Sequence, residues 1–149
     1  MKINIIAIGK QKKSPSLDMC KEYIKRMKWK VNFKEIDAPK GSNKEKEAKL
    51  ILKEISEGSF IIALDERGKS FTSPEFSKKI PLWQNQAINN ELFFLIGGAD
   101  GFDKIIRDKA KILLSFGKQT WPHMLVRVML LEQLYRAQQI DEGHPYHRQ

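Results

Sequence analysis

Cysteine and histidine are scarce in this sequence of 149 residues, and their scarcity excludes several kinds of site. Cys20 is the single cysteine, so the chain cannot form an internal disulfide. The three histidines do not combine with it in any spacing typical of zinc ligands, which argues against a structural metal centre. We therefore expect no metal, and a protein of a reducing compartment such as the cytoplasm.

Long apolar runs are also missing. The run Ile3–Ile8 at the N-terminus meets Gly9 and Lys10 too early for a signal peptide or a membrane-spanning helix. We expect no targeting segment, no membrane association and a cytoplasmic location.

Acidic residues are few relative to basic ones. The chain has 27 Lys and Arg against 18 Asp and Glu, a formal charge of +9, which favours an acidic partner such as nucleic acid. Residues 1–58 hold 15 of the basic and 8 of the acidic residues, so this part carries +7 and the rest only +2. Lys10, Lys12 and Lys13 are candidates for phosphate contacts, and the alternative is that they only keep the surface soluble. The sequence contains no basic motif interleaved with aromatics that is typical of an RNA-binding module.

Hydrophobic residues make up 41% of the chain, enough for one ordinary core, so we expect a single domain over residues 1–149. Apolar runs predict strands that alternate with helices, and this alternation predicts an α/β fold with a mainly parallel sheet and helices on both faces. The expected strands are 2–8, 31–36, 60–64, 92–96 and 112–115, with 31–36 half exposed or at an edge. The expected helices are 14–27, 42–58, 73–83 and 123–139, with a short one between the last two strands.

Three local patterns predict where elements begin or end. Ser42 with Glu45 is typical of a capping box for the second helix. Ser73 followed by Pro74 predicts the start of the third helix. The polar stretch 65–70 is expected to be a loop after the third strand.

The stretch 91–136 is where we expect a ligand, because carboxyl ends of parallel strands leave a crevice with free backbone groups. The strand 92–96 runs into a glycine turn with Gly97, Gly98 and Gly101. The turn lacks the spacing of a dinucleotide fingerprint, and Asp100 and Asp103 would repel a pyrophosphate, which excludes NAD and nucleoside triphosphates. An adenine or ribose lying against main chain fits better, and the alternative is a turn with no ligand.

The segment from His123 to about Gln139 is apolar on nearly every side, so it needs cover all round, and a dimer partner is a natural cover in a small domain. Glu132 and Arg136, four residues apart, are expected to pair, and alternatively they orient a substrate base or the C-terminal tail. His123 at the helix start is expected to hold the preceding loop as a neutral imidazole, with catalysis as the alternative.

Four blocks of sequence carry a family resemblance. In order, they are Phe94–Gly101, Leu113–His123, Val126–Ala137 and His144–Arg148. Together they resemble the RlmH family, which are S-adenosylmethionine-dependent methyltransferases of the SPOUT class that act on ribosomal RNA. The resemblance covers essentially the whole chain.

The resemblance implies a fold, a reaction and a cofactor. It implies an α/β domain whose C-terminal part forms a trefoil knot, and a homodimer. It implies methylation of N3 of a pseudouridine in helix 69 of 23S ribosomal RNA, on the assembled ribosome, with S-adenosylmethionine as donor. An in-line methyl transfer needs no metal and no covalent nucleophile.

The resemblance also assigns residues. The residues implied to contact the donor are Leu64, Gly97, Phe116, Gly117, Lys118, Gln119, Thr120 and Trp121. Because N3 of a pseudouridine must lose its proton, we take His147 as a candidate base, with Tyr146 stacking on the target or hydrogen-bonding it and with Glu132 and Arg136 as orienting groups.

Two other classes of function remain open at this level. One is a SPOUT methyltransferase that acts on transfer RNA, which would share the donor site. The other is a non-catalytic α/β protein that binds the ribosome, which would share the charge and the fold but would not need the composite loop and tail.

Overall fold

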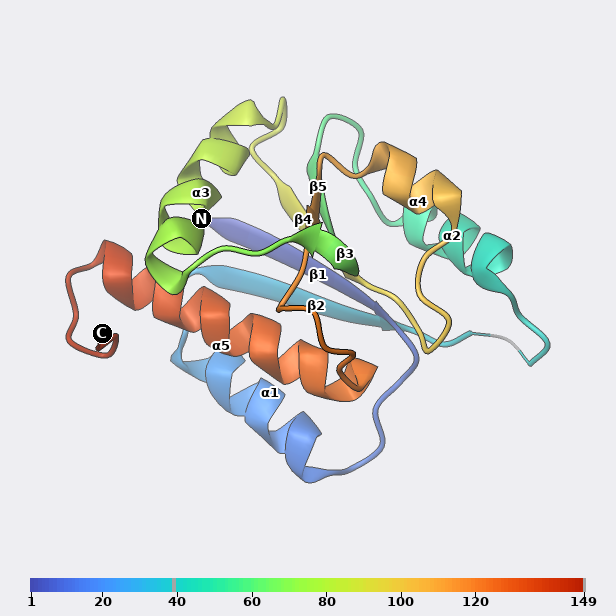
Figure 1. Ribbon diagram of the computed structural model, residues 1–149, viewed down its shortest axis with the longest axis horizontal. Helices are drawn as coiled ribbons and strands as arrows, with labels where there is room; N and C mark the ends of the chain where they lie inside the picture. The colour runs from blue at the N-terminus through green and yellow to red at the C-terminus, as the bar shows by residue number, and fades with distance from the viewer. Residues whose placement is uncertain (39, 149) are drawn as a thin grey trace.

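The computed structural model describes residues 1–38 and 40–148, and its centre is a five-stranded parallel sheet (Figure 1). The strands are β1 (Lys2–Ile8), β2 (Lys30–Ile36), β3 (Phe60–Lys69), β4 (Leu92–Ile96) and β5 (Ile112–Leu114). Their order in the sheet is β2-β1-β4-β3-β5, and every neighbouring pair is parallel. The predicted α/β class and the edge position of β2 are confirmed.

Five helices cover the two faces of this sheet (Figure 1). They are α1 (Pro15–Arg26), α2 (Lys44–Lys53), α3 (Ser73–Gln86), α4 (Lys104–Lys109) and α5 (His123–Asp141). The side chains of α1, α3 and α5 pack on one face, and those of α2 and α4 pack on the other. The prediction of helices on both faces is confirmed. The burial of the central strands explains it.

The central strands bury alternate side chains in two separate cores. In β1, Ile3 and Ile5 belong to the core under α1, α3 and α5, whereas Ile6 and Ile8 belong to the core under α2 and α4. β4 is divided in the same way, and all five of its residues are buried. A strand buried on both faces has no polar face, which is why β4 and the first half of β3 are continuous apolar runs and the buried part of β1 is interrupted only by Asn4, whose side chain is hydrogen-bonded.

Two predicted N-cap residues, Ser42 and Ser73, were wrong by one residue, and one helix ends early. The N-cap of α2 is Asn43 and not Ser42, since the Asn43 side chain accepts a hydrogen bond from the Lys46 amide at 2.9 Å. α3 is capped by Thr72, which forms the reciprocal capping box with Glu75. Neighbouring residues with equivalent side-chain acceptors compete for a cap, and the entry path of the chain decides between them. α2 ends at Lys53 rather than near residue 58.

The predicted loop at 65–70 was also wrong, because β3 continues to Lys69. Leu64 and Lys69 both pair with Leu114, so residues 65–68 form an irregular segment within the strand. Backbone pairing with β5 keeps this polar stretch in the sheet although Glu66, Arg67 and Lys69 are exposed. Gly68 permits the close approach, since a Cβ at this position would collide with the backbone of Leu113.

α5 is covered mainly within the chain. It packs against α1, α3 and β4, and its buried positions include Leu130, Leu131 and Leu134. Leu125 is 40% exposed. The all-round apolar pattern is therefore explained by a helix enclosed by two others and a sheet, and a dimer partner is not needed to explain it.

The largest fully buried side chain is that of Arg127, in the second turn of α5. Its guanidinium forms an ion pair with Glu35 of β2 at 2.6 Å. It also donates to the backbone carbonyls of Ile8 and Gly9, at 2.7 and 2.8 Å. Burial lowers the pKa of Arg127 and the carboxylate of Glu35 acts the other way, so the arginine stays charged. This contact fixes the start of α5 to the carboxyl ends of β1 and β2.

We predict that Arg127→Met reduces the free energy of unfolding by about 3 kcal/mol, because it leaves two carbonyl acceptors and one carboxylate without their buried donor. Urea denaturation followed by circular dichroism measures the change. Arg26→Met, which removes an exposed pair with Glu22, is the matched control and should change stability by less than about 0.5 kcal/mol. Equal losses for the two variants would contradict a special role for Arg127.

We further predict that Gly68→Ala destabilises the protein by about 1–3 kcal/mol, the usual cost of overpacking, because the new methyl group displaces β5 from β3. Lys69→Ala, at the next and exposed position of the same strand, serves as control. Amide hydrogen exchange should accelerate at Ser115, whose amide donates to the Lys69 carbonyl. Unchanged stability and exchange would show that β5 tolerates the displacement.

Candidate functional site

A cavity of about 480 Å³ lies at the carboxyl end of the sheet, and parts of the chain far apart in sequence form its walls. β3 contributes Leu64 and the irregular segment after it, and the turn after β4 contributes residues 96–102. The loop after β5 and the first turn of α5 complete it. The loops after β4 and β5 do not leave adjacent strands, because β3 lies between these two in the sheet. The ends of three strands, β3, β4 and β5, therefore build this site.

The glycine turn gives the cavity a wall of main chain. The Gly101 amide donates to the Gly98 carbonyl at 3.0 Å, which closes the turn. A Cβ on Gly97 would lie 3.2 Å from the backbone of Gly101, so a larger residue would require the turn to shift by a few tenths of an ångström. The close packing makes a tight turn whose backbone faces the cavity, and contact of this backbone with an adenine or ribose stays a prediction.

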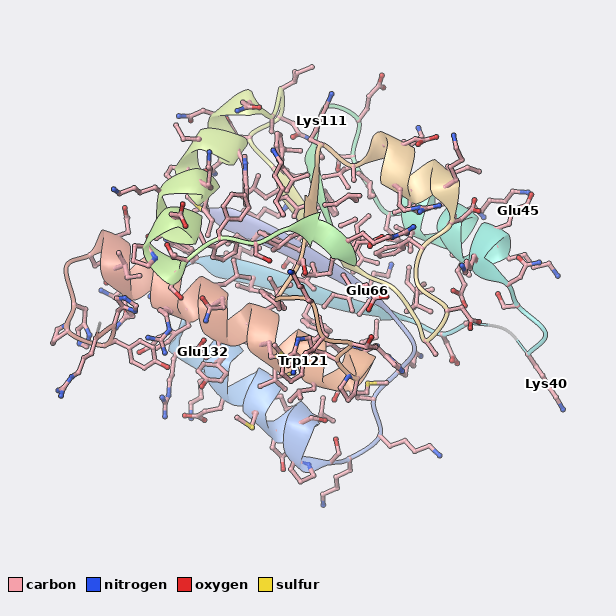
Figure 2. All side chains as sticks on the ribbon, in the orientation of Figure 1. Lys40, Glu45, Glu66, Lys111, Trp121 and Glu132 are labelled. Carbon is pink, nitrogen blue, oxygen red and sulfur yellow. The ribbon has the colours of Figure 1, made fainter. Side chains whose placement is uncertain are left out.

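The loop 116–121 is fixed to β3 by hydrogen bonds. Buried Ser115 accepts from the Gly117 amide at 3.1 Å and lies within hydrogen-bond distance of the carbonyls of Glu66 and Gly117. Thr120 donates to the Glu66 carboxylate at 2.9 Å, and the Trp121 indole donates to the Phe116 carbonyl at 3.3 Å. Figure 2 labels Glu66, which belongs to β3, and Trp121, which belongs to the loop. The loop is thus held before any ligand binds.

Seven of the eight residues assigned to donor contact line this cavity, and Lys118 does not. The seven are Leu64, Gly97, Phe116, Gly117, Gln119, Thr120 and Trp121. Lys118 is exposed. The structure therefore brings together residues from three separate blocks of the sequence.

Our sequence reasoning missed the charged side chains of the cavity. Asp65, Glu66, Arg67 and Arg107 all line it. The first three follow a buried strand directly, a signal that we interpreted as a solvent loop. Arg107 carries no signal in the sequence, because only the packing of α4 brings it to the cavity.

Asp65 is the best-satisfied of these charges. It accepts the Arg67 backbone amide at 2.9 Å and the Arg67 guanidinium at 3.2 Å. Burial opposes ionisation of Asp65, but the hydrogen bonds from Arg67 outweigh it and hold the pKa of this carboxyl below its ordinary value, with Arg107 acting in the same direction. Asp65 is therefore ionised at neutral pH.

His123 lines the same cavity, but it does not hold the preceding loop in the way that we expected. Its Nδ1 is buried, and no described residue hydrogen-bonds to that atom. Burial and then the charge of Arg127 lower the pKa of His123, so the imidazole is neutral at physiological pH.

The four residues proposed for catalysis form a second cluster, on the C-terminal half of α5. Arg136 pairs with Glu132 at 2.7 Å, as predicted, and Tyr146 donates to the same carboxylate at 3.2 Å. Arg136 lies 4.8 Å from the centre of the Tyr146 ring and 3.1 Å from Nδ1 of His147. The tail therefore turns back onto its own helix (Figure 1). None of these four residues lines the cavity at the strand ends.

The contact with Arg136 fixes the tautomer of His147. An arginine can only donate, so Nδ1 accepts and a neutral His147 carries its proton on Nε2. That Nε2 is buried, and no described residue accepts from it. Burial is the largest cause that raises the pKa of Tyr146, followed by its contact with Tyr23, so the phenol stays protonated. Both tail side chains are thus hydrogen-bond donors in this arrangement.

A second cavity, of about 540 Å³, has residues of both groups in its wall. It lies between α1, α5 and the start of α3, and Glu132 is in its wall. Residues 114–117 line both cavities. The loop after β5 therefore has the predicted donor residues on one side and the tail cluster near its other side.

Two searches bear on other kinds of site. Within residues 1–38 and 40–148, no three His, Cys, Asp or Glu side chains gather in an arrangement that could hold a metal ion. Over the same ranges, no helix combines the length and the apolar character needed to cross a membrane.

Comparison with known proteins agrees with the geometry. A family model described as "Predicted SPOUT methyltransferase" matches residues 1–147. The chain is 43% identical over 152 residues to a Rhodospirillum centenum protein and 43% identical over 156 residues to one from Dinoroseobacter shibae, with 99% of each chain covered. A Paracoccus denitrificans protein is 40% identical over 157 residues, with both chains covered completely. All three relatives are named ribosomal RNA large subunit methyltransferase H. As the resemblance to the RlmH family predicted, the chain belongs to the SPOUT methyltransferase family.

Proposed function

We propose that this protein transfers a methyl group from S-adenosylmethionine to N3 of a pseudouridine in helix 69 of 23S ribosomal RNA, on the assembled ribosome and in the cytoplasm. The observation that carries the proposal is the cavity, where seven residues implied by the family line one hollow. The name shared by the relatives supports ribosomal RNA as substrate. The family also implies a trefoil knot in the C-terminal part, which stays a prediction.

The residues of the cavity fit such a donor. Its volume, about 480 Å³, is within the usual range for small-molecule sites. The backbone of Gly97 and Gly117 offers a close surface for adenosine, and Phe116 and Trp121 offer apolar contact. When bound, S-adenosylmethionine supplies an activated methyl group on sulfur. The protein's part is to position the two reactants in line and to exclude water.

The tail cluster is proposed to receive the target base. Tyr146 would stack on the base or donate to it, and the Glu132–Arg136 pair would hold the tail in place. His147 would assist loss of the N3 proton. Because Arg136 occupies Nδ1 and Nε2 carries the proton, His147 can accept a proton only after its contact with Arg136 opens.

A homodimer would bring the two groups of residues together. In one chain the tail packs on α5 and contributes nothing to the lining of the donor cavity. We propose that the tail of one subunit serves the cavity of the other. Leu125, 40% exposed near the start of α5, is available for such contact.

The basic loop after β1 is proposed to bind ribosomal RNA phosphates. The basic loop follows the carboxyl end of β1, and the cavity lies at the same end of the sheet. Lys10, Lys12 and Lys13 are exposed there. The Gln11 amide donates to Glu35 at 2.8 Å, so the loop is fastened through the same carboxylate that pairs with Arg127. A held loop loses less conformational entropy on binding than a free one.

The proposal predicts that methyl from labelled S-adenosylmethionine is transferred to assembled ribosomes and not to bulk transfer RNA. The ribosomes should come from a strain without the homologous enzyme, so that the target position is unmodified, and mass mapping of the RNA would locate the methyl group. Transfer to transfer RNA would indicate a different SPOUT enzyme. Donor binding without transfer to either RNA would contradict the proposed substrates, and absence of donor binding would favour a non-catalytic ribosome-binding protein.

A second prediction concerns the tail. His147→Ala should lower kcat on ribosomes by about 10²-fold or more, the usual range for a lost acid–base group, with donor affinity unchanged because His147 does not line the cavity. Asp141→Ala changes an exposed residue at the end of α5 that makes no side-chain hydrogen bond or ion pair within residues 1–38 and 40–148, so it is the control and should retain activity. Full turnover by His147→Ala would remove this residue from the mechanism.

A further inference from the structure

Arg107 of α4 is a charged residue of the cavity wall whose guanidinium has a buried nitrogen without a partner among the described residues. Its side chain lines the cavity, and within residues 1–38 and 40–148 it makes no ion pair or side-chain hydrogen bond. Its Nε is buried without a partner. An arginine is always charged, and a buried donor without an acceptor is costly, so this position is suited to an anion supplied from outside.

The nearest carboxylate is already occupied. Asp65 is close enough to Arg107 for the charges to interact, yet its oxygens accept from Arg67. Glu66 accepts from Thr120. Arg107 is therefore a cation without a bonded counter-charge among the described residues, in a cavity wall that carries both signs of charge.

The cavity wall combines two kinds of surface. Gly97, Gly117, Phe116 and Trp121 provide main chain and apolar surface, whereas the segment 65–67 and Arg107 provide charge. A methyl donor of the S-adenosyl type has the same division, with a neutral adenosine at one end and an amino acid at the other. The amino acid carries one carboxylate and one ammonium.

We propose that Arg107 binds the carboxylate of the donor's amino-acid end, with Asp65 and Glu66 balancing the ammonium. This inference rests on the proposed function, since it concerns the same donor. An arginine can grip a carboxylate with two parallel hydrogen bonds, which fixes the orientation of the donor as well as its affinity. An RNA phosphate is a poorer match for Arg107, because the Nε of this residue is buried in the wall of a cavity of about 480 Å³. Lys10, Lys12 and Lys13 are exposed and are more accessible to phosphates.

Ligands that differ only at the amino-acid end provide the test. S-adenosylhomocysteine has the carboxylate, and methylthioadenosine lacks the whole amino acid. Calorimetry should show that Arg107→Gln weakens binding of S-adenosylhomocysteine by about 10- to 100-fold, the range for a lost charged hydrogen bond. Binding of methylthioadenosine should change by less than about twofold, since that ligand has no carboxylate for Arg107 to grip. Arg107→Lys should fall between wild type and Arg107→Gln, because a lysine keeps the charge but not the paired geometry.

Lys109→Gln is the matched control, because it removes the same charge from the same helix at an exposed position outside the cavity. It should bind both ligands as wild type does. Equal weakening of both ligands by Arg107→Gln would indicate general damage to the pocket and would overturn the inference. Unchanged binding of both would overturn it too, and if ribosome affinity fell instead, Arg107 would be an RNA contact. Failure of wild type to bind either ligand would overturn the proposed function itself.

Discussion

The buried contact between Arg127 and the ends of β1 and β2 is the constraint on which the site depends. A charged guanidinium without exposed surface is tolerated only where acceptors surround it, and here a carboxylate and two backbone carbonyls do so. Those acceptors lie at the carboxyl ends of β1 and β2, so the contact joins the start of α5 to the end of the sheet where the cavity lies. The wall of the cavity and the beginning of the basic loop are positioned together as a result.

A second constraint acts at the other side of the sheet. β5 is only three residues long, yet its pairing with the irregular part of β3 determines where the loop 116–121 begins. Gly68 removes the side chain that would keep the strands apart, and Ser115 fastens the loop to the Glu66 carbonyl. The polar segment 65–67 is consequently held in the cavity wall. A loop held by backbone contacts needs little reorganisation when a ligand enters.

The long helix then separates two kinds of chemistry. Its first turn lines the cavity at the strand ends, and its second half carries Glu132, labelled in Figure 2, and Arg136, which hold the tail. In the proposed function these are the two separate surfaces that a methyl donor and a target base need. Residues 114–117 line both cavities and are the part of the chain that the two cavities share.

The sequence by itself determined where most of the elements lie and predicted the chemistry carried by contiguous motifs. Apolar runs located β1, β3, β4 and β5, because strands in the interior of the sheet bury nearly every side chain, and alternation of polar and apolar residues located β2. The glycine turn and the loop 116–121 were predicted to contact a ligand, and the structure places both in the wall of one cavity. Tertiary structure decided what depends on partners distant in sequence. Pairing with β5 made a strand of residues 65–69, the packing of α4 brought Arg107 to the cavity, and acceptors more than ninety residues away made a buried charge of Arg127. The local sequence encodes which surface of a segment must be buried. Whether a charged side chain has a counter-charge depends on residues distant in sequence, so only the folded chain determines it.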